Sequence, residues 1–592
     1  MDFLDLNGNG TQNNCRERIV SEDTYNFITD FPLTGLPGLG EAFCSANVDG
    51  LYNILYVEPQ VLSVLDLEAY QYQSVPKLYG LMQVDGSAVF DLGDLVTKDA
   101  GRFSPDALIA SGITQVQSAP LSLTGQGCVI CFIDTGIDYT REAFLDENGD
   151  SRILAIWDQS IQTGTPPAGF QYGSEYTRED INTALQAGDP YAFVPSRDEI
   201  GHGTALAGVA AGRERTGASR YTGAAPDADI VVVKLKPCKT SLRQYNLVPD
   251  GVPAYQEDDI MLAVQYANTF VNELSRPVII CLGIGTNAGD HAGNSALSRY
   301  LNVVAVRRSR AVVVCGGNEG GAAHHFRGNL LQANNAEQNV EVRVGDNCSG
   351  FVMECWSTLP DTLQIGLRSP GGESIPPIRV DAGQSLTYRL IYANTVVRLD
   401  TTIVETSSGE QLLRFFLEDP APGIWTFRVS GSGVLYNGTF DMWLPITQFL
   451  DAPVVFLQPD PYITMTEPAM AMDVIAVTFY NPANLSFAID SGRGFTRLGA
   501  IRPDFSAPGV NVATPAGTQS GSGLACAITA GAVAQLFQWA VVQRRNPYAE
   551  SRELKSYLIR GANRLWDLSY PNREWGYGRL NLEGVFDALI GG

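Results

Sequence analysis

Residues 121–327 alternate between short continuous apolar runs and segments with helical periodicity. The apolar runs read GCVICFID, DADIVVVKLK, PVIICLG and AVVVCGGN. This alternation is typical of a parallel sheet that helices cover on both faces. The predicted helix over 258–274 carries one apolar stripe with a spacing of three or four residues, formed by Ile260, Val264, Ala267 and Val271. We therefore predict a doubly wound α/β domain.

The pattern changes in three other parts of the chain. Residues 328–452 alternate apolar and polar positions between turns rich in Gly, Pro, Asn and Asp, as in NVEVRVGDN and GIWTFRVSG, which predicts an antiparallel β-sandwich. The α/β pattern resumes over 453–592, so the sandwich is inserted into the larger domain. Residues 1–90 mix strand-like and helix-like pieces and predict a small α+β unit. The first part of the larger domain is residues 91–327, and it begins with a linker-like stretch.

Composition excludes several classes of partner. The 592 residues hold 40 Lys and Arg against 64 Asp and Glu, a net charge of −24, without a basic run. Non-specific nucleic-acid binding requires clustered basic residues, so we expect no nucleic-acid partner. The N-terminus MDFLDLNGNG has neither a positive region nor an apolar core, and no apolar stretch is long enough to span a membrane. We expect no signal peptide, no membrane span and synthesis in the cytoplasm.

The ten cysteines are scattered, and several lie in strand-like runs, so we expect buried reduced thiols. Cys128 and Cys131 form a C-x-x-C pair, which elsewhere binds metals or exchanges disulfides. Residues three apart on a strand point to opposite faces, which disfavours that chemistry here. We expect neither a metal nor a cofactor.

Three stretches carry residues suited to catalysis. CFIDTGIDY places Asp134 at the carboxyl end of a strand, where open α/β sheets hold functional groups. GHGTALAG surrounds His202 with glycines, and SGSGLACAITAGAVA, residues 520–534, opens a helix of small residues. Each has an ordinary structural explanation when taken alone, namely a turn cap, a satisfied polar residue or close packing. Their combination and order favour a site.

Together these motifs resemble the subtilisin-like serine proteases, in which an aspartate orients a histidine that takes the proton of a serine. CGGNEG resembles the oxyanion-hole motif of the family, with Asn318 as donor. GAAPDADIVVVKL, RPDFSAPGV and EWGYGRLNLEGVFDAL are similar to further family segments. The resemblance implies roles for Asp134, His202 and Asn318 in the catalytic site.

At the nucleophile motif the chain departs from the family. Aligning Gly-Thr-Ser-x-Ala-x-Pro with GSGLACA places Gly523 at the serine position. A shift by one residue would make Ser522 the nucleophile, but Leu524 would then take the small-residue position. The shift would also turn the side chain by about 100° around the helix. Gly523 therefore predicts a pseudoprotease. The alternative is an active endopeptidase, which uses Ser522 or in which Gly523 is an introduced substitution. A purely adhesive or structural protein would explain neither GHGT nor GNEG.

Within the family, the chain is similar to the clostridial spore germination subtilases of the Csp type. These have an N-terminal prodomain and a jelly-roll sandwich between the oxyanion asparagine and the serine. ILAIWDQSIQTG, residues 153–164, and the pair His324 and His325 also resemble that group. The histidine pair has a metal-binding interpretation, but adjacent histidines do not readily chelate one ion, which favours packing or capping.

The Csp resemblance implies more about function. Active members cleave a cortex-lytic enzyme precursor, while paralogues without triad residues act as regulators or proposed germinant sensors. We therefore expect a regulatory or binding role, with another germination protease or a small germinant as partner and a spore-associated location. Without a serine the prodomain stays uncut, and its end, VPKLYGLM at 75–82, is expected to occupy the substrate groove.

Overall fold

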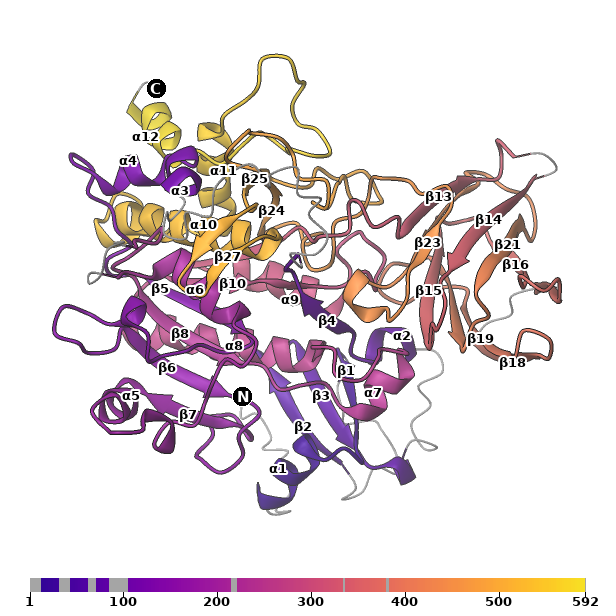
Figure 1. Ribbon diagram of the computed structural model, residues 1–592, viewed down its shortest axis with the longest axis horizontal. Coiled ribbons are helices and arrows are strands. Elements are labelled where there is room, and N and C mark those ends of the chain that lie inside the picture. The colour runs from indigo at the N-terminus through magenta and orange to yellow at the C-terminus, as the bar shows by residue number, and fades with distance from the viewer. Residues whose placement is uncertain are drawn as a thin grey trace, which may run out of the picture.

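The computed structural model describes residues 12–30, 43–61, 71–84, 105–214, 221–333, 336–378 and 383–590. The first ten residues, on which the expectation about a signal peptide rests, lie outside these ranges. Figure 1 shows the central sheet and its helices on the left and the inserted strands on the right.

The central sheet has eight strands, all parallel except the edge strand β7, which runs antiparallel to β6. In spatial order they are β25 (Phe505–Pro508), β24 (Ile475–Tyr480), β12 (Arg310–Cys315), β10 (Val278–Leu282), β5 (Val129–Asp134), β8 (Asp229–Lys234), β6 (Ile153–Asp158) and β7 (Ser174–Thr177). The predicted α/β sheet is present.

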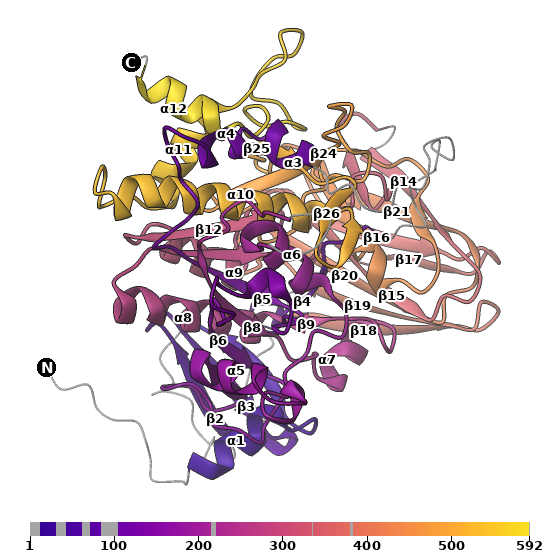
Figure 2. The same ribbon diagram turned by 60° about the vertical axis from the view of Figure 1, so that its left-hand side comes forward.

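Helices cover both faces of this sheet, because its strands are apolar on both sides. Along β5, Ile130 and Phe132 face the core that contains helix α10 (Ser522–Phe537), called here the α10-side core. Val129 and Cys131 face the core that contains helix α8 (Glu257–Leu274), called here the α8-side core. Helix α6 (His202–Ala211) lies on the α10 side and α9 (Ala296–Ala305) on the α8 side. Figure 2 shows α10 above the strands of the sheet and α8 below them.

The Cys128 and Cys131 thiols lie in these two opposite cores, as strand geometry predicts. Burial raises the pKa of both thiols. Helix α8 buries Ile260, Val264 and Ala267 of the predicted stripe. Short helices fill the α10 side where the sequence suggested only a linker: α3 (Pro105–Ala110) and α4 (Ile113–Gln117) bury Ala107, Ile113 and Val116. Their five or six residues are too few to show a helical period. Four further helices are α5 (Arg178–Leu185), α7 (Thr240–Tyr245), α11 (Ser551–Gly561) and α12 (Leu582–Ile590).

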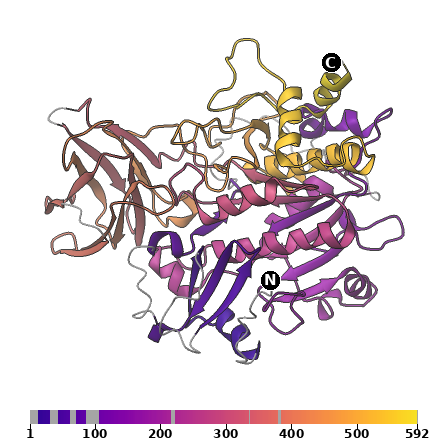
Figure 3. The same ribbon diagram turned by 180° about the vertical axis from the view of Figure 1, so that it is seen from behind.

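The N-terminal unit packs on the α8 side. Its strands β1 (Tyr25–Thr29), β3 (Tyr52–Val57) and β2 (Phe43–Val48) form an antiparallel sheet in that order, next to helix α1 (Gln12–Val20). Ile28, Val48, Ile54 and Tyr56 belong to the same core as helices α8 and α9. Figure 3 shows the indigo strands beside these magenta helices. The unit therefore shares a core with the domain that follows it.

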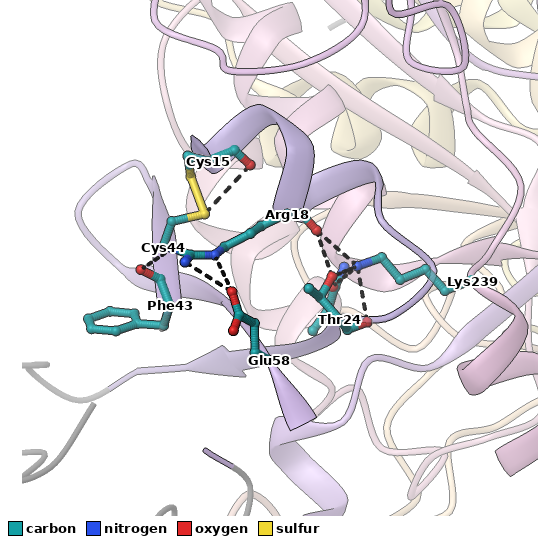
Figure 4. The surroundings of a disulfide bond; sticks show 8 residues. Cys15, Arg18, Thr24, Phe43, Cys44, Glu58 and Lys239 are labelled. Atoms are coloured by element: carbon teal, nitrogen blue, oxygen red, sulfur yellow. Dashed lines mark hydrogen bonds and ion pairs between the residues drawn. A yellow bond between two sulfur atoms is a disulfide. The ribbon is translucent and has the colours of Figure 1, made fainter. Parts of the chain in front are cut away.

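A disulfide corrects the expectation that all cysteines are reduced. Cys15 of α1 is bonded to Cys44 of β2 (Figure 4). Nearby, Arg18 pairs with Glu58 at 3.0 Å, and Lys239 of the main domain donates to the hydroxyl of Thr24 at 2.6 Å. The two cysteines are 29 residues apart and show no recognisable motif. The other eight cysteines are free and buried.

The inserted segment forms two antiparallel sheets around a core of their own. Strand β14 shows the cause: Val340, Val342 and Val344 are buried and the residues between them are not. One sheet has the order β13 (His325–Asn329), β22 (Thr439–Trp443), β15 (Gly350–Ser357), β20 (Gln411–Glu418), β19 (Thr395–Thr402), β18 (Gln384–Leu390). The other has the order β17 (Ser374–Ile378), β16 (Leu363–Arg368), β21 (Gly423–Gly431), β14 (Glu337–Val344), β23 (Val454–Phe456).

One helical segment among the described residues is long and apolar enough to cross a membrane, Ser522–Val542. In the folded protein, 83% of the apolar stretch of this segment is buried. Its composition is that of the central helix of the α10-side core, which also carries position 523.

Candidate active site

Asp134 and His202 form a buried pair. Asp134 ends β5 and His202 begins α6, and Nδ1 of His202 lies 2.7 Å from Oδ1 of Asp134. The backbone N–H of Thr135 also donates to that oxygen, at 2.8 Å. His202 is 2% exposed and Asp134 is fully buried. Burial lowers the pKa of His202, but the charge and hydrogen bond of Asp134 raise it, and the net shift is upward.

The glycines beside His202 have separate structural reasons. Gly201 caps α6 in the left-handed region with φ 86°, which glycine adopts at no steric cost. A Cβ at Gly203 would lie 2.2 Å from the carbonyl oxygen of Gly136, so α6 approaches the end of β5 only with glycine there. The motif GHG thus brings His202 against Asp134.

Gly523 faces the other nitrogen of the same imidazole. It is the second residue of α10, and a Cβ built on it would lie 3.1 Å from Nε2 of His202. A side chain at position 523 would therefore begin beside the nitrogen that takes a proton in a serine protease. This geometry agrees with the alignment that places Gly523 at the nucleophile position.

Ser522 lies differently. The residue is fully buried, and its Oγ has no hydrogen-bond partner among the described residues. Nearby, Ser520 Oγ accepts from the N–H of Asn511 at 2.9 Å. Among the described residues, neither hydroxyl is hydrogen-bonded to His202.

Asn318 completes the group that the motifs predicted. Its Oδ1 accepts from the N–H of Ser522 at 3.0 Å. Its Nδ2 is buried and has no hydrogen-bond partner among the described residues. An amide donor without a partner, next to position 523, is what an oxyanion site requires.

A stretch of the N-terminal region crosses this site. Strand β4 (Leu78–Leu81) lies between β9 (Tyr255–Gln256) and β11 (Ile284–Gly285), antiparallel to both. Beyond it, Met82 donates to the carbonyl of Gly283 and accepts from the N–H of Gly523, both at 3.0 Å. Val84 then donates to Ser520 at 2.9 Å. The Met82–Gln83 peptide bond thus lies at Gly523.

Buried carboxylates border the cleft, and no motif in the sequence predicted them. Glu257 accepts from the backbone N–H groups of Lys77 and Leu297. The backbone of Glu467 is hydrogen-bonded to the backbone of Thr286, next to β11. Burial and the charge of Asp290 raise the pKa of the Glu467 side chain to about 8. The motifs did not point to Gly80, which lies within β4. An isolated glycine inside a strand often marks a place where another part of the protein approaches the backbone closely.

The adjacent histidines have separate partners. Nδ1 of His324 lies 2.7 Å from Glu319, and Nε2 of His325 lies 3.1 Å from Asp441. The ring of His325 stacks on Trp443. These contacts agree with the packing interpretation of the pair. Among the residues that the structure describes, no three His, Cys, Asp or Glu side chains are grouped so as to hold a metal ion.

Comparison with known proteins gives one family match. The model of the subtilase family matches residues 125–350, which include Asp134, His202 and Asn318. Over this part of its length the chain is similar to the subtilases. It is similar to the CspB protease of Clostridium perfringens, with 29% identity and a TM-score of 0.72 over 82% of this chain and 97% of that one. This supports the resemblance to Csp-type subtilases and the subtilase fold.

Other solved proteases are less similar. The prenylagaramide maturation protease PagA is 13% identical, with a TM-score of 0.37 over 81% of this chain and 98% of that one. A serine protease of Aeromonas sobria is 13% identical, with a TM-score of 0.37 over 80% of this chain and 61% of that one. No curated protein matches the chain.

Proposed function

We propose that this subtilase is a pseudoprotease that retains its N-terminal segment in the cleft and acts by binding. The observation that supports this most directly is the path of residues 78–84, which cross Gly523 with the Met82 carbonyl on the Gly523 N–H. The Met82–Gln83 peptide bond lies beside Gly523, which has no side chain that could attack it.

The missing side chain has a known energetic consequence. Acyl transfer by this family needs an oxygen nucleophile next to the imidazole. In subtilisin, removal of that serine lowers turnover by about 10⁶-fold. Asp134, His202 and Asn318 alone would leave residual hydrolysis only about 10³- to 10⁴-fold above that in water.

The biological role is proposed from the Csp resemblance. It is a regulatory role in spore germination, in which the partner is another germination protease or a small germinant. Residues 1–90 then serve as a retained prodomain, and the inserted sandwich corresponds to the jelly roll of that group.

An active endopeptidase with serine at position 523 is the second candidate. One observation favours it: His202 still pairs with Asp134, and Asn318 keeps a free amide donor. Such a form would be expected to process a cortex-lytic enzyme precursor. Ser522 is a poor substitute nucleophile because its buried hydroxyl makes no hydrogen bond to His202 among the described residues.

A fluorophosphonate probe separates these candidates. We expect no labelling of the natural chain or of Ser522→Ala, and labelling at position 523 in Gly523→Ser. His202→Ala combined with Gly523→Ser is the matched control and should abolish that labelling. Labelling of the natural chain that Ser522→Ala removes would contradict the proposal.

A further inference from the structure

We propose that residues Leu444–Leu450, called here the strap, close the peptide cleft over β4 and favour glycine at position 80. The cleft then prefers this chain's own N-terminal segment to extended peptides that carry a large side chain at the matching position. This inference rests on the proposed occupation of the cleft by β4.

Strand β4 is covered on both faces. Successive side chains on a strand point to opposite sides. Tyr79 and Leu81 belong to the α8-side core, whereas Leu78 and Met82 belong to the α10-side core, together with Ile446 and Phe449 of the strap. A peptide in an open groove would leave one face to solvent, but none of these residues of β4 and Met82 is more than 7% exposed.

Gly80 is the point of closest approach. A Cβ on Gly80 would lie 2.5 Å from Cδ1 of Ile446 and 2.7 Å from the side-chain amide of Gln448. Both contacts are with side-chain ends: Ile446 is buried beside a small cavity that Leu78 and Phe449 also line, and Gln448 is half-buried. The backbone of Gly80 is not in the left-handed region. A larger residue at position 80 would therefore have to displace both side chains, for reasons of space and not of backbone conformation.

The strap is fastened to both walls of the cleft. Beyond β9, the side chain of Gln448 donates to the carbonyl of Pro253 at 3.0 Å. Beyond β11, the side chain of Asn287 donates to the carbonyl of Leu444 at 3.1 Å. The side chain of Gln448 thus lies next to Gly80 of β4 and is hydrogen-bonded to the wall of the cleft that contains β9.

A third attachment reaches the candidate oxyanion site. Glu319, the neighbour of Asn318, accepts from the N–H and the hydroxyl of Thr447, both at 3.1 Å. His324 holds the same carboxylate at 2.7 Å. The strap is thereby tied to the loop that carries Asn318.

The root of the strap is fixed by stacking. Trp443 precedes it and lies between two imidazole rings, His291 at 4.1 Å and His325 at 4.7 Å between ring centroids. His291 belongs to the main domain and His325 to the first strand of the sandwich. The insertion thus presents the strap to the cleft from an anchored position.

Tryptic cleavage after Lys77 tests the inference in the natural Gly523 background. Lys77 is 7% exposed, so its cleavage reports withdrawal of the segment from the cleft. We expect Gly80→Leu to raise the rate of this cleavage at least about tenfold. Gly433→Leu is the matched control, because a Cβ there meets nothing within 4 Å, and it should leave the rate unchanged.

A compensating variant keeps the test independent of general misfolding. Adding Ile446→Ala and Gln448→Ala to Gly80→Leu frees the space that leucine needs, and the rate should return toward that of the natural chain. An unchanged rate in Gly80→Leu, or a raised rate that the two alanines do not lower, would overturn the inference. The fluorophosphonate experiment tests the nucleophile separately, so failure of one proposal is distinguishable from failure of the other.

Discussion

The two halves of the candidate site differ in what holds them together. Asp134 and His202 are buried and hydrogen-bonded to each other. By contrast, Gly523 donates its N–H to Met82, and the Nδ2 of Asn318 has no partner in the part of the chain that the structure describes. Loss of His202 would leave a buried carboxylate unpaired, which is costly. Loss of a serine side chain leaves no charge behind. If the proposed function holds, this difference explains why the acid–base pair persists although position 523 is glycine.

The largest expected effect comes from breaking that pair. His202→Ala should lower the free energy of unfolding by about 3–5 kcal/mol, since it strands the buried Asp134. Denaturant titration measures this loss. The double variant Asp134→Asn with His202→Gln removes both charges and should cost less than His202→Ala. A cost below about 1 kcal/mol for His202→Ala would show that the pair contributes little to the fold.

The pair also predicts a pH dependence with a definite sign. The pKa of His202 is raised in the folded state, so the protonated imidazole stabilises the fold. This contribution is complete below the ordinary histidine pKa and is lost as pH rises through the raised value. Denaturation of the natural chain and His202→Ala across this range should show their difference in stability shrinking as the pH increases.

Glu467 supplies a contrasting case, a buried acid without a basic partner at bonding distance among the described residues. In the folded chain the pKa of Glu467 is about 8, so the carboxyl group keeps its proton up to about that pH. In the unfolded chain the same group loses its proton above the ordinary glutamate pKa, so the two states differ in bound protons between these values. Stability should therefore fall as the pH rises toward 8. Glu467→Gln imitates the protonated form, so it should match the natural chain at acidic pH and exceed it by about 2–4 kcal/mol near pH 8.

The control for Glu467→Gln is Glu179→Gln at an exposed position. It should change stability by no more than about 0.5 kcal/mol at either pH. Equal stability of Glu467→Gln and the natural chain at both pH values would contradict a protonated Glu467.

The smallest effect is expected at Asn318. In the natural chain its side chain accepts one hydrogen bond, from Ser522, so Asn318→Ala should cost about 1 kcal/mol in the free energy of unfolding. A loss of 3 kcal/mol or more would mean that this half of the site carries as much of the fold as the acid–base pair does.

The sequence predicted those parts of the site whose signals are local. Asp134, His202 and Gly523 lie in short motifs, each at a strand or helix end, and VPKLYGLM was expected near the site because of the family layout. The strap was not predicted, because Gly80 and Ile446 meet only in three dimensions. The Cys15–Cys44 disulfide was missed for the same reason, since cysteine spacing does not reveal pairing.

The most direct test of the account is the intact mass of the chain with and without a nucleophile. The natural chain should remain a single species of 63.9 kDa. Gly523→Ser should convert to two fragments, the first ending at Met82 and the second beginning at Gln83. A natural chain that is cut between these residues, or a Gly523→Ser chain that stays whole or breaks at a different bond, would contradict the claim that Gly523 occupies the place of the nucleophile beneath an intact N-terminal segment.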